Sequence, residues 1–200
     1  MQRPANTLIS LWAAIALASA AAAGCTTAAP QPSQSQPGSS SEHATPTASA
    51  TPVSCQGGWR TTRLAVARQV SVPPVPVATA IRTGSHSGCR FDRIAIDIRG
   101  ALPGYTVAFV RKVIQDASGK TISVPGTRYL LIRLRPAQGH SPSGATTLSP
   151  RSRLLGYPML KGYAVAGDFE GVLTIALGLS GGTRFRVGEL TGRLYVDIAW

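Results

Sequence analysis

Side-chain alternation with a period of two residues constrains the fold of this chain more than any other feature. Over residues 91–99, isoleucines occupy one side of an extended segment, and charged residues occupy the other. The same period recurs in four further segments, namely 105–109, 129–135, 173–179 and 194–199. It is weaker in 77–82, 121–124, 163–167 and 185–189. Such segments are typical of half-buried strands, with one face on a core and one in water.

Turn signals separate these segments, and no stretch shows a long helical period. Glycine and proline cluster at 101–104, 125–126 and 180–182, where they favour tight turns. Eight or nine short strands joined in this way predict an all-β, antiparallel sandwich or barrel. Residues 138–157 show no periodicity. We expect them to form a long loop, which is a candidate ligand-contacting element.

The pattern of the first 24 residues predicts an export signal. Arg3 is followed by an apolar run that ends on small residues just before Cys25, the order found in signal peptides. The run is shorter than the ~20 residues of a membrane-spanning helix. With Cys25 at this place, the segment resembles the lipobox of bacterial lipoproteins, which implies lipidation of Cys25. The alternative is an ordinary signal peptide cut nearby, which would leave Cys25 a spare thiol.

The chain is therefore expected to have three parts. A lipoprotein signal peptide occupies 1–24, and Cys25 begins a linker that runs to residue 53. Ser, Thr, Pro, Ala and Gln dominate this linker, and Glu42 is the only charged side chain in it, so it is expected to be a disordered spacer. Residues 54–200 form a single β domain behind it.

The charge of the chain belongs to this domain. The sequence has 20 Lys and Arg against 8 Asp and Glu, and with Arg3 and Glu42 set aside, 19 against 7 remain. An exported basic protein meets anionic lipid and acidic wall polymers rather than nucleic acid. The alternative is that Arg-rich composition reflects a GC-rich genome, with the charges spread over a solvated surface.

Cysteine usage agrees with export. With Cys25 assigned to the anchor, Cys55 and Cys89 remain as one possible disulfide, which an oxidising compartment would preserve. No spacing of Cys and His fits a zinc site. We expect no metal and no cofactor.

Few residues suggest catalysis. In an extended segment, the side chains of Asp168 and Glu170 would project to the same side. Glycoside hydrolases use two carboxylates that lie near each other in this way. The alternative is that they order a turn or pair with arginine. His86 and His140 lack a nearby nucleophile elbow, and no glycine-rich phosphate loop exists. We expect no enzymatic activity.

A cationic stripe is the better candidate for binding. Arg133 and Arg135 share the polar face of one predicted strand with Tyr129, and the loop that follows contributes His140, Arg151 and Arg153. Guanidinium groups form bidentate bonds to carboxylates and phosphates. These residues are therefore candidate binding residues for peptidoglycan or for the phosphates of wall polymers. The alternative is a solvated face with partners inside the domain, such as Asp97 or Asp197.

Several short motifs resemble the AMIN-like domain of bacterial lipoproteins, a relative of the amidase N-terminal module. They are residues 82–86 leading to 91–93, 103–105, 134–137 with His140, 167–171 and 185–187. The resemblance covers roughly 77–200. It implies an antiparallel β-sandwich and a non-catalytic envelope module, because amidase N-terminal modules are similar to murein-targeting domains.

Together these observations predict a cell-envelope lipoprotein on the outer face of the membrane. Its β-sandwich would bind peptidoglycan or an anionic wall polymer. The alternatives are a scaffold that binds an envelope protein, and a wall hydrolase that uses Asp168 and Glu170.

Overall fold

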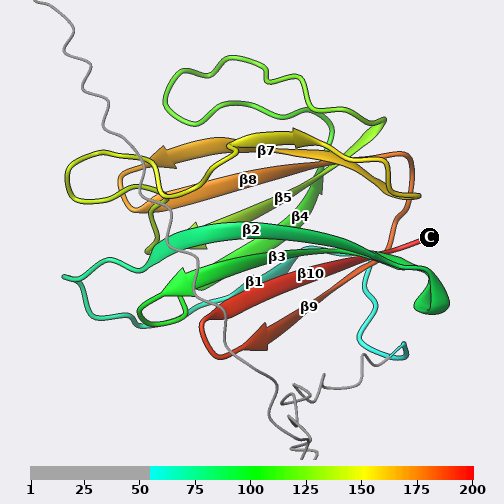
Figure 1. Cartoon of the computed structure of the whole chain (residues 1–200), viewed down its shortest axis with the longest axis horizontal. Coiled ribbons are helices and arrows are strands. Elements are labelled where there is room, and N and C mark those ends of the chain that lie inside the picture. Colours follow the sequence, from blue (N-terminus) through cyan, green and yellow to red (C-terminus); the bar gives the residue numbers. More distant parts are fainter. Residues whose placement is uncertain (1–54) are drawn as a thin grey trace, which may run out of the picture. The chain divides into compact units, whose positions relative to one another are not determined.

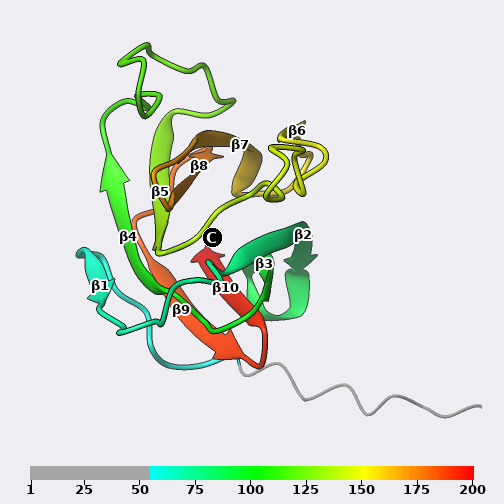
Figure 2. The ribbon, with the colours of Figure 1, turned by 90° about the vertical axis from the view of Figure 1, so that its left-hand side faces the viewer.

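The computed structural model describes residues 55–200, which belong to one compact unit spanning 50–200. The predicted signal peptide 1–24, Cys25 and the linker to residue 53 lie outside the described residues. The described part forms two antiparallel sheets packed face to face, and Figure 2 separates the two layers. The predicted all-β sandwich is confirmed. No helix in this part is long and apolar enough to cross a bilayer.

One sheet has six strands and the other has four (Figure 1). The six-stranded sheet runs in the order β1 (Leu64–Val66), β4 (Gly104–Val110), β5 (Arg128–Arg135), β8 (Val172–Leu179), β7 (Leu160–Phe169) and β6 (Ser152–Leu154). The four-stranded sheet runs β2 (Val77–His86), β3 (Phe91–Arg99), β10 (Arg193–Ala199) and β9 (Phe185–Leu190). A single 3-10 turn, η1 (Ser87–Cys89), joins β2 to β3.

The alternating residues of both sheets meet in one core. Its fully buried members include three residues of β3 or β10 and three of β5 or β8, namely Ile94, Ile96, Val196, Leu130, Ile132 and Ile175. Burying such a side chain stabilises the fold by about 1.5–3 kcal/mol. The inward faces predicted from the period of two are therefore correct.

The outer face of β8 is also buried, contrary to the prediction of a half-buried strand. Residues 111–127, which we call the covering loop, cross this face, and Thr174 and Ala176 are fully buried beneath them. A Cβ on Gly178 would lie 1.8 Å from the carbonyl oxygen of Pro125. The prediction of a strand at 121–124 is wrong, because this stretch forms only one isolated bridge, from Ile114 to Thr121. It belongs instead to the segment that covers the outer face of the sheet.

The predicted loop 138–157 is only partly irregular. Within 138–157, Ser152–Leu154 pairs with β7 as the edge strand β6, and His140 bridges to Thr146. The prediction of a loop throughout 138–157 is therefore wrong at residues 152–154. A three-residue strand is too short to show a period in the sequence.

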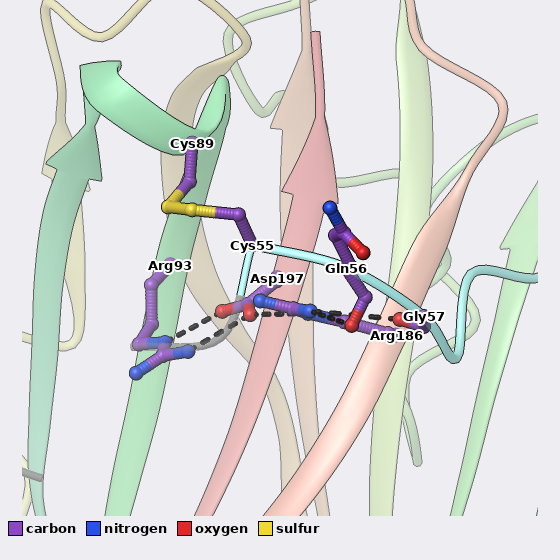
Figure 3. Close-up of a disulfide and its surroundings, with 7 residues drawn as sticks. All are labelled: Cys55, Gln56, Gly57, Cys89, Arg93, Arg186 and Asp197. Carbon is purple, nitrogen blue, oxygen red and sulfur yellow. Dashed lines mark hydrogen bonds and ion pairs between the residues drawn. A yellow bond between two sulfur atoms is a disulfide. The ribbon is translucent and has the colours of Figure 1, made fainter. Parts of the chain in front are cut away.

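Cys55 and Cys89 form a disulfide, as predicted, with their Cα atoms 4.9 Å apart. The bond joins the first described residues to η1, at the tip of the β2–β3 hairpin (Figure 3). Below it, Asp197 lies between Arg93 and Arg186, with which it forms ion pairs of 2.6 and 2.8 Å. Arg186 also donates to the carbonyls of residues 56 and 57. The segment after Cys55 is thus held to the four-stranded sheet covalently and by hydrogen bonds.

Candidate functional site

An open groove of about 570 Å³ lies at one end of the six-stranded sheet. One wall is the segment 65–70, which includes the end of β1. The other comprises the first residues of β4, the last residues of β5 and Val172. Ligand sites in proteins typically have volumes of about 300–1,000 Å³, so the groove is large enough to be one. We call it the basic groove, after Arg68, Arg133 and Arg135, which line it.

Gly104 allows the two walls of the basic groove to approach each other. It begins β4 between the edge strand β1 and the end of β5. A Cβ at this position would lie 3.0 Å from the carbonyl oxygens of Val66 and Arg135 and 3.1 Å from the nitrogen of Arg68. Any larger residue would push these backbones apart.

Arg68 is fixed by a link between the two sheets. Its guanidinium donates to Glu189 on β9 at 2.5 Å, and the hydroxyl of Tyr105 on β4 donates to the other carboxylate oxygen at 2.7 Å. Because the glutamate accepts both bonds, it holds the segment 65–70 against the sandwich. This link defines the position of one wall of the basic groove.

The link shifts the pKa values of both acidic groups. The hydrogen bond from Tyr105 is the main cause that lowers the pKa of Glu189; Arg68 lowers it further, and partial burial opposes the shift. The pKa of Tyr105 is raised, first by burial of its hydroxyl and then by its bond to Glu189. The glutamate is therefore ionised, and the tyrosine neutral, near pH 7.

The other two arginines of the basic groove differ in their partners. Arg133 donates to Asp116 of the covering loop at 3.1 Å, an ion pair exposed to solvent. Arg135 is exposed, and no carboxylate within residues 55–200 pairs with it. Its guanidinium is free to meet an anion that enters the groove.

The six predicted ligand-binding residues do not form one site. Arg133 and Arg135 line the basic groove, as described. Tyr129 shares their outward face but packs against the small cluster under the covering loop, with its hydroxyl 3.4 Å from the carbonyl of Gly126. The ring of Tyr129 is therefore partly covered.

His140 and Arg151 meet at Asp168 instead. The carboxylate of Asp168 is nearly buried and lies 3.0 Å from His140 Nδ1 and 3.5 Å from Arg151 Nη1. It also accepts the backbone N–H of Gly139 at 2.8 Å. Arg153, on edge strand β6, lines a separate hollow of about 310 Å³. Asp168 thus anchors the 138–157 loop.

The paired carboxylates expected for a hydrolase are not arranged as a pair. Phe169 and Val172 face each other across a two-residue turn, and Glu170 and Gly171 form that turn with φ of +49° and +69°. Positive φ at both positions is what a type I′ hairpin requires. Glu170 is exposed at this turn, whereas the carboxylate of Asp168 already pairs with His140 of the 138–157 loop. The alternation that placed both on one side ends at Phe169.

The histidines offer no metal site among residues 55–200. No group of three His, Cys, Asp or Glu there is close enough to hold an ion. His86 stacks on Phe91 with ring centroids 4.6 Å apart. Burial is the main cause that lowers its pKa, followed by the charge of Arg93.

The wall of the basic groove that contains Arg68 could not be predicted from the sequence. Arg68 lies in 67–76, where no periodicity marks a strand. Tyr105 and Glu189 are brought together from β4 and β9, which are distant in sequence and belong to different sheets. No local pattern could have predicted this contact.

The sequence matches the AMIN-like domain over residues 76–200. The chain belongs to the AMIN-like domain family. This confirms the resemblance drawn from the short motifs. No curated protein and no solved structure is detectably similar to the chain.

The AMIN-like domain begins at residue 76, so residues 55–75 precede it. This N-terminal extension supplies β1, Arg68 and one wall of the basic groove. The other wall, with Arg133 and Arg135, belongs to the AMIN-like domain itself. Family membership suggests a peptidoglycan-associated binding module.

Proposed function

We propose that this chain is a lipid-anchored, non-catalytic module of the cell envelope that binds peptidoglycan or an anionic wall polymer through the basic groove. The observation that carries the proposal is the exposed guanidinium of Arg135. It lies in a groove of about 570 Å³ with no carboxylate partner among the described residues.

The lining of the basic groove suits an anionic group on a partly apolar backbone. Arg135 and Arg133 lie on one wall, and Val66, Val70 and Val172 supply apolar surface beside them. A guanidinium binds carboxylate or phosphate through two parallel hydrogen bonds. The carboxylates of stem peptides and the phosphates of wall polymers both fit this chemistry.

The positions of the acidic residues support a binding role rather than hydrolysis. Asp168 already accepts bonds from the backbone of Gly139 and from His140. Glu170 lies in a hairpin turn. Neither has the arrangement of an acid and a nucleophile that face each other across a substrate.

The lipid anchor is proposed from the sequence alone. A small-residue cleavage site directly before Cys25 supports acylation of that thiol. Growth with an alkyne-labelled fatty acid should label the wild-type chain and leave Cys25→Ser unlabelled. Equal labelling of both chains would contradict the anchor.

Binding is tested by co-sedimentation of the full chain, in non-ionic detergent, with purified sacculi across a salt series. Sacculi are used with and without their anionic polymers. We expect saturable binding, weakened about tenfold or more by Arg135→Gln, because a charge-assisted hydrogen bond contributes about 1.5–3 kcal/mol. Stripped sacculi that bind equally well identify peptidoglycan as the ligand; loss of binding identifies the anionic polymer.

Arg128→Gln is the matched control, because Arg128 is exposed at the opposite end of the same strand, beside Phe109 rather than in the groove. It removes the same charge. An equal loss of binding in both variants would mean that the interaction is only general charge attraction. Absence of any binding to either form of sacculus would favour a protein partner instead.

A further inference from the structure

A second hollow, of about 370 Å³, lies beside the start of β3 and the end of β10. We call it the tryptophan pocket. It is lined by two tryptophans, two arginines, the disulfide and one alanine, namely Trp59, Trp200, Arg90, Arg184, Cys55, Cys89 and Ala199. It shares no lining residue with the basic groove. The two sites are therefore separable by mutation.

We propose that the tryptophan pocket binds an acidic sugar, that is, a saccharide ring that carries a carboxylate. The chemical basis is the combination of indole surfaces with guanidinium groups that have no carboxylate side chain as a partner among residues 55–200. Ligand sites commonly combine an aromatic lining with a few polar groups that fix orientation. This inference goes beyond the basic groove and does not depend on it.

The two indoles are held in place by cations and by a neighbouring ring. The guanidinium of Arg186 lies 4.7 Å from the ring centre of Trp59, which also packs against Phe91 at 6.2 Å. The guanidinium of Arg90 lies 5.6 Å from the ring centre of Trp200. Rigid aromatic surfaces give contact area at a low entropic cost.

Two arginines of the pocket have no carboxylate side chain as an ion-pair partner among the described residues. Arg90 and Arg184 are exposed, and neither forms an ion pair with a carboxylate among residues 55–200. Asp197, which lies on the adjacent strand, is already occupied by Arg93 and Arg186. An anion that enters the pocket would therefore meet two guanidiniums that pair with no carboxylate side chain of residues 55–200.

The backbone of Arg90 is held in an unusual conformation. Its φ is +54°, in the left-handed region that non-glycine residues rarely adopt. Its N–H donates to Ser87, and its carbonyl accepts the N–H of Trp200 at 3.0 Å. Such strain persists where the surroundings enforce it and is common at binding sites. The bond from Trp200 continues the ladder of β3 and β10 one residue beyond the pair of Phe91 and Ala199.

The indole N–H of Trp200 is a further unused donor. Its Nε1 is buried and has no hydrogen-bond partner within the described part of the chain. Buried donors normally have a partner.

The disulfide makes the pocket rigid. Cys55 and Trp59 precede the AMIN-like domain, whereas the remaining lining residues belong to it. The bond from Cys55 to Cys89 thus fixes one wall to the other. Preorganisation of this kind improves affinity because less entropy is lost on binding.

The tryptophan indole signals in a nitrogen–proton NMR spectrum report directly on this pocket. The chain has three tryptophans, Trp12, Trp59 and Trp200, and Trp59→Phe and Trp200→Phe assign the last two. The full chain is titrated with N-acetylmuramic acid, with N-acetylglucosamine, which lacks the lactyl carboxylate, and with acetate. We expect the acid sugar to shift both signals, and either control to shift them about tenfold less at equal concentration, because a charge-assisted bond is lost or the sugar ring is absent.

The double variant Arg90→Gln/Arg184→Gln should weaken the response to the acid sugar by about tenfold, and Arg135→Gln in the basic groove should leave it unchanged. Reduction of the disulfide should weaken it as well. Equal shifts with acetate, equal shifts with N-acetylglucosamine, or no shift at all would each overturn the proposal. Loss of sacculus binding in Arg135→Gln with the indole response intact would show that the two sites act separately.

Discussion

The carboxylate of Asp92 on β3 accepts the backbone N–H of Leu160 at 2.8 Å, so that one sheet of the sandwich caps a strand of the other. The same oxygen accepts the N–H of Met159, and the second oxygen accepts the hydroxyl of Ser85. Asp92 is fully buried. A polar side chain in this position satisfies groups that would otherwise be buried without partners.

Replacing Asp92 tests this cap. Asp92→Ala leaves two amide hydrogens and a hydroxyl unpaired, and we expect it to lower the free energy of unfolding by about 3 kcal/mol or more. Asp92→Asn can still accept both amide hydrogens and can donate to Ser85, so it should stay within about 1 kcal/mol of the wild type. Urea unfolding measures both. Equal losses would mean that the charge, rather than the hydrogen bonds, stabilises the fold.

The covering loop over β8 makes a second prediction. A Cβ on Gly178 would clash with Pro125, so Gly178→Ala should displace residues 111–127 and lower stability by about 1–3 kcal/mol. Gly181→Ala is the control, because no atom lies within 4 Å of a Cβ there. Thermal unfolding compares the two. A similar melting temperature for both variants would contradict the tight contact between loop and strand.

Acid should release the wall of the basic groove. Because the folded pKa of Glu189 is lowered by Tyr105 and Arg68, ionised Glu189 stabilises the fold above its unfolded pKa of about 4.3, and this contribution is lost as pH falls through the folded pKa. We therefore expect wild type to be more stable than Glu189→Gln near neutral pH. The difference should vanish in acid. Urea midpoints across pH measure it, and a difference independent of pH would contradict the link.

Loss of the disulfide should destabilise the domain without abolishing its fold. Cys55 and Cys89 are 34 residues apart, and closing a loop of that size stabilises by about 3–4 kcal/mol in the chain-entropy model. The double variant Cys55→Ser/Cys89→Ser should therefore lose about 3–4 kcal/mol of unfolding free energy and melt at a lower temperature. Its circular dichroism at low temperature should match the wild type. An unchanged melting temperature would mean that the residues after Cys55 are held by their other contacts.

Much of the sandwich could be predicted because its strands are long and alternate. The period of two located β3, β5 and β10 and their inward faces correctly. It could not reveal β1 or β6, because three residues show no period. Nor could it show that the outer face of β8 is covered, although the small residues Ala176 and Gly178 are a signal for such packing.

The candidate site was predictable only where it lies on one strand. Arg133 and Arg135 followed from the alternation of β5. Arg68 did not, because its position depends on Glu189, which lies 121 residues away. Contacts between sheets depend on how the sheets pack, and local pattern carries no information about that.

The disulfide also determines how a mechanical load would pass through the domain. A force applied to the chain ahead of Cys55 crosses the sulfur bridge to Cys89 and reaches β3 directly. The three-residue edge strand β1 and the whole of β2 lie between the two cysteines in sequence and are bypassed. The bridge therefore shields one wall of the basic groove from tension that would otherwise peel β1 away first.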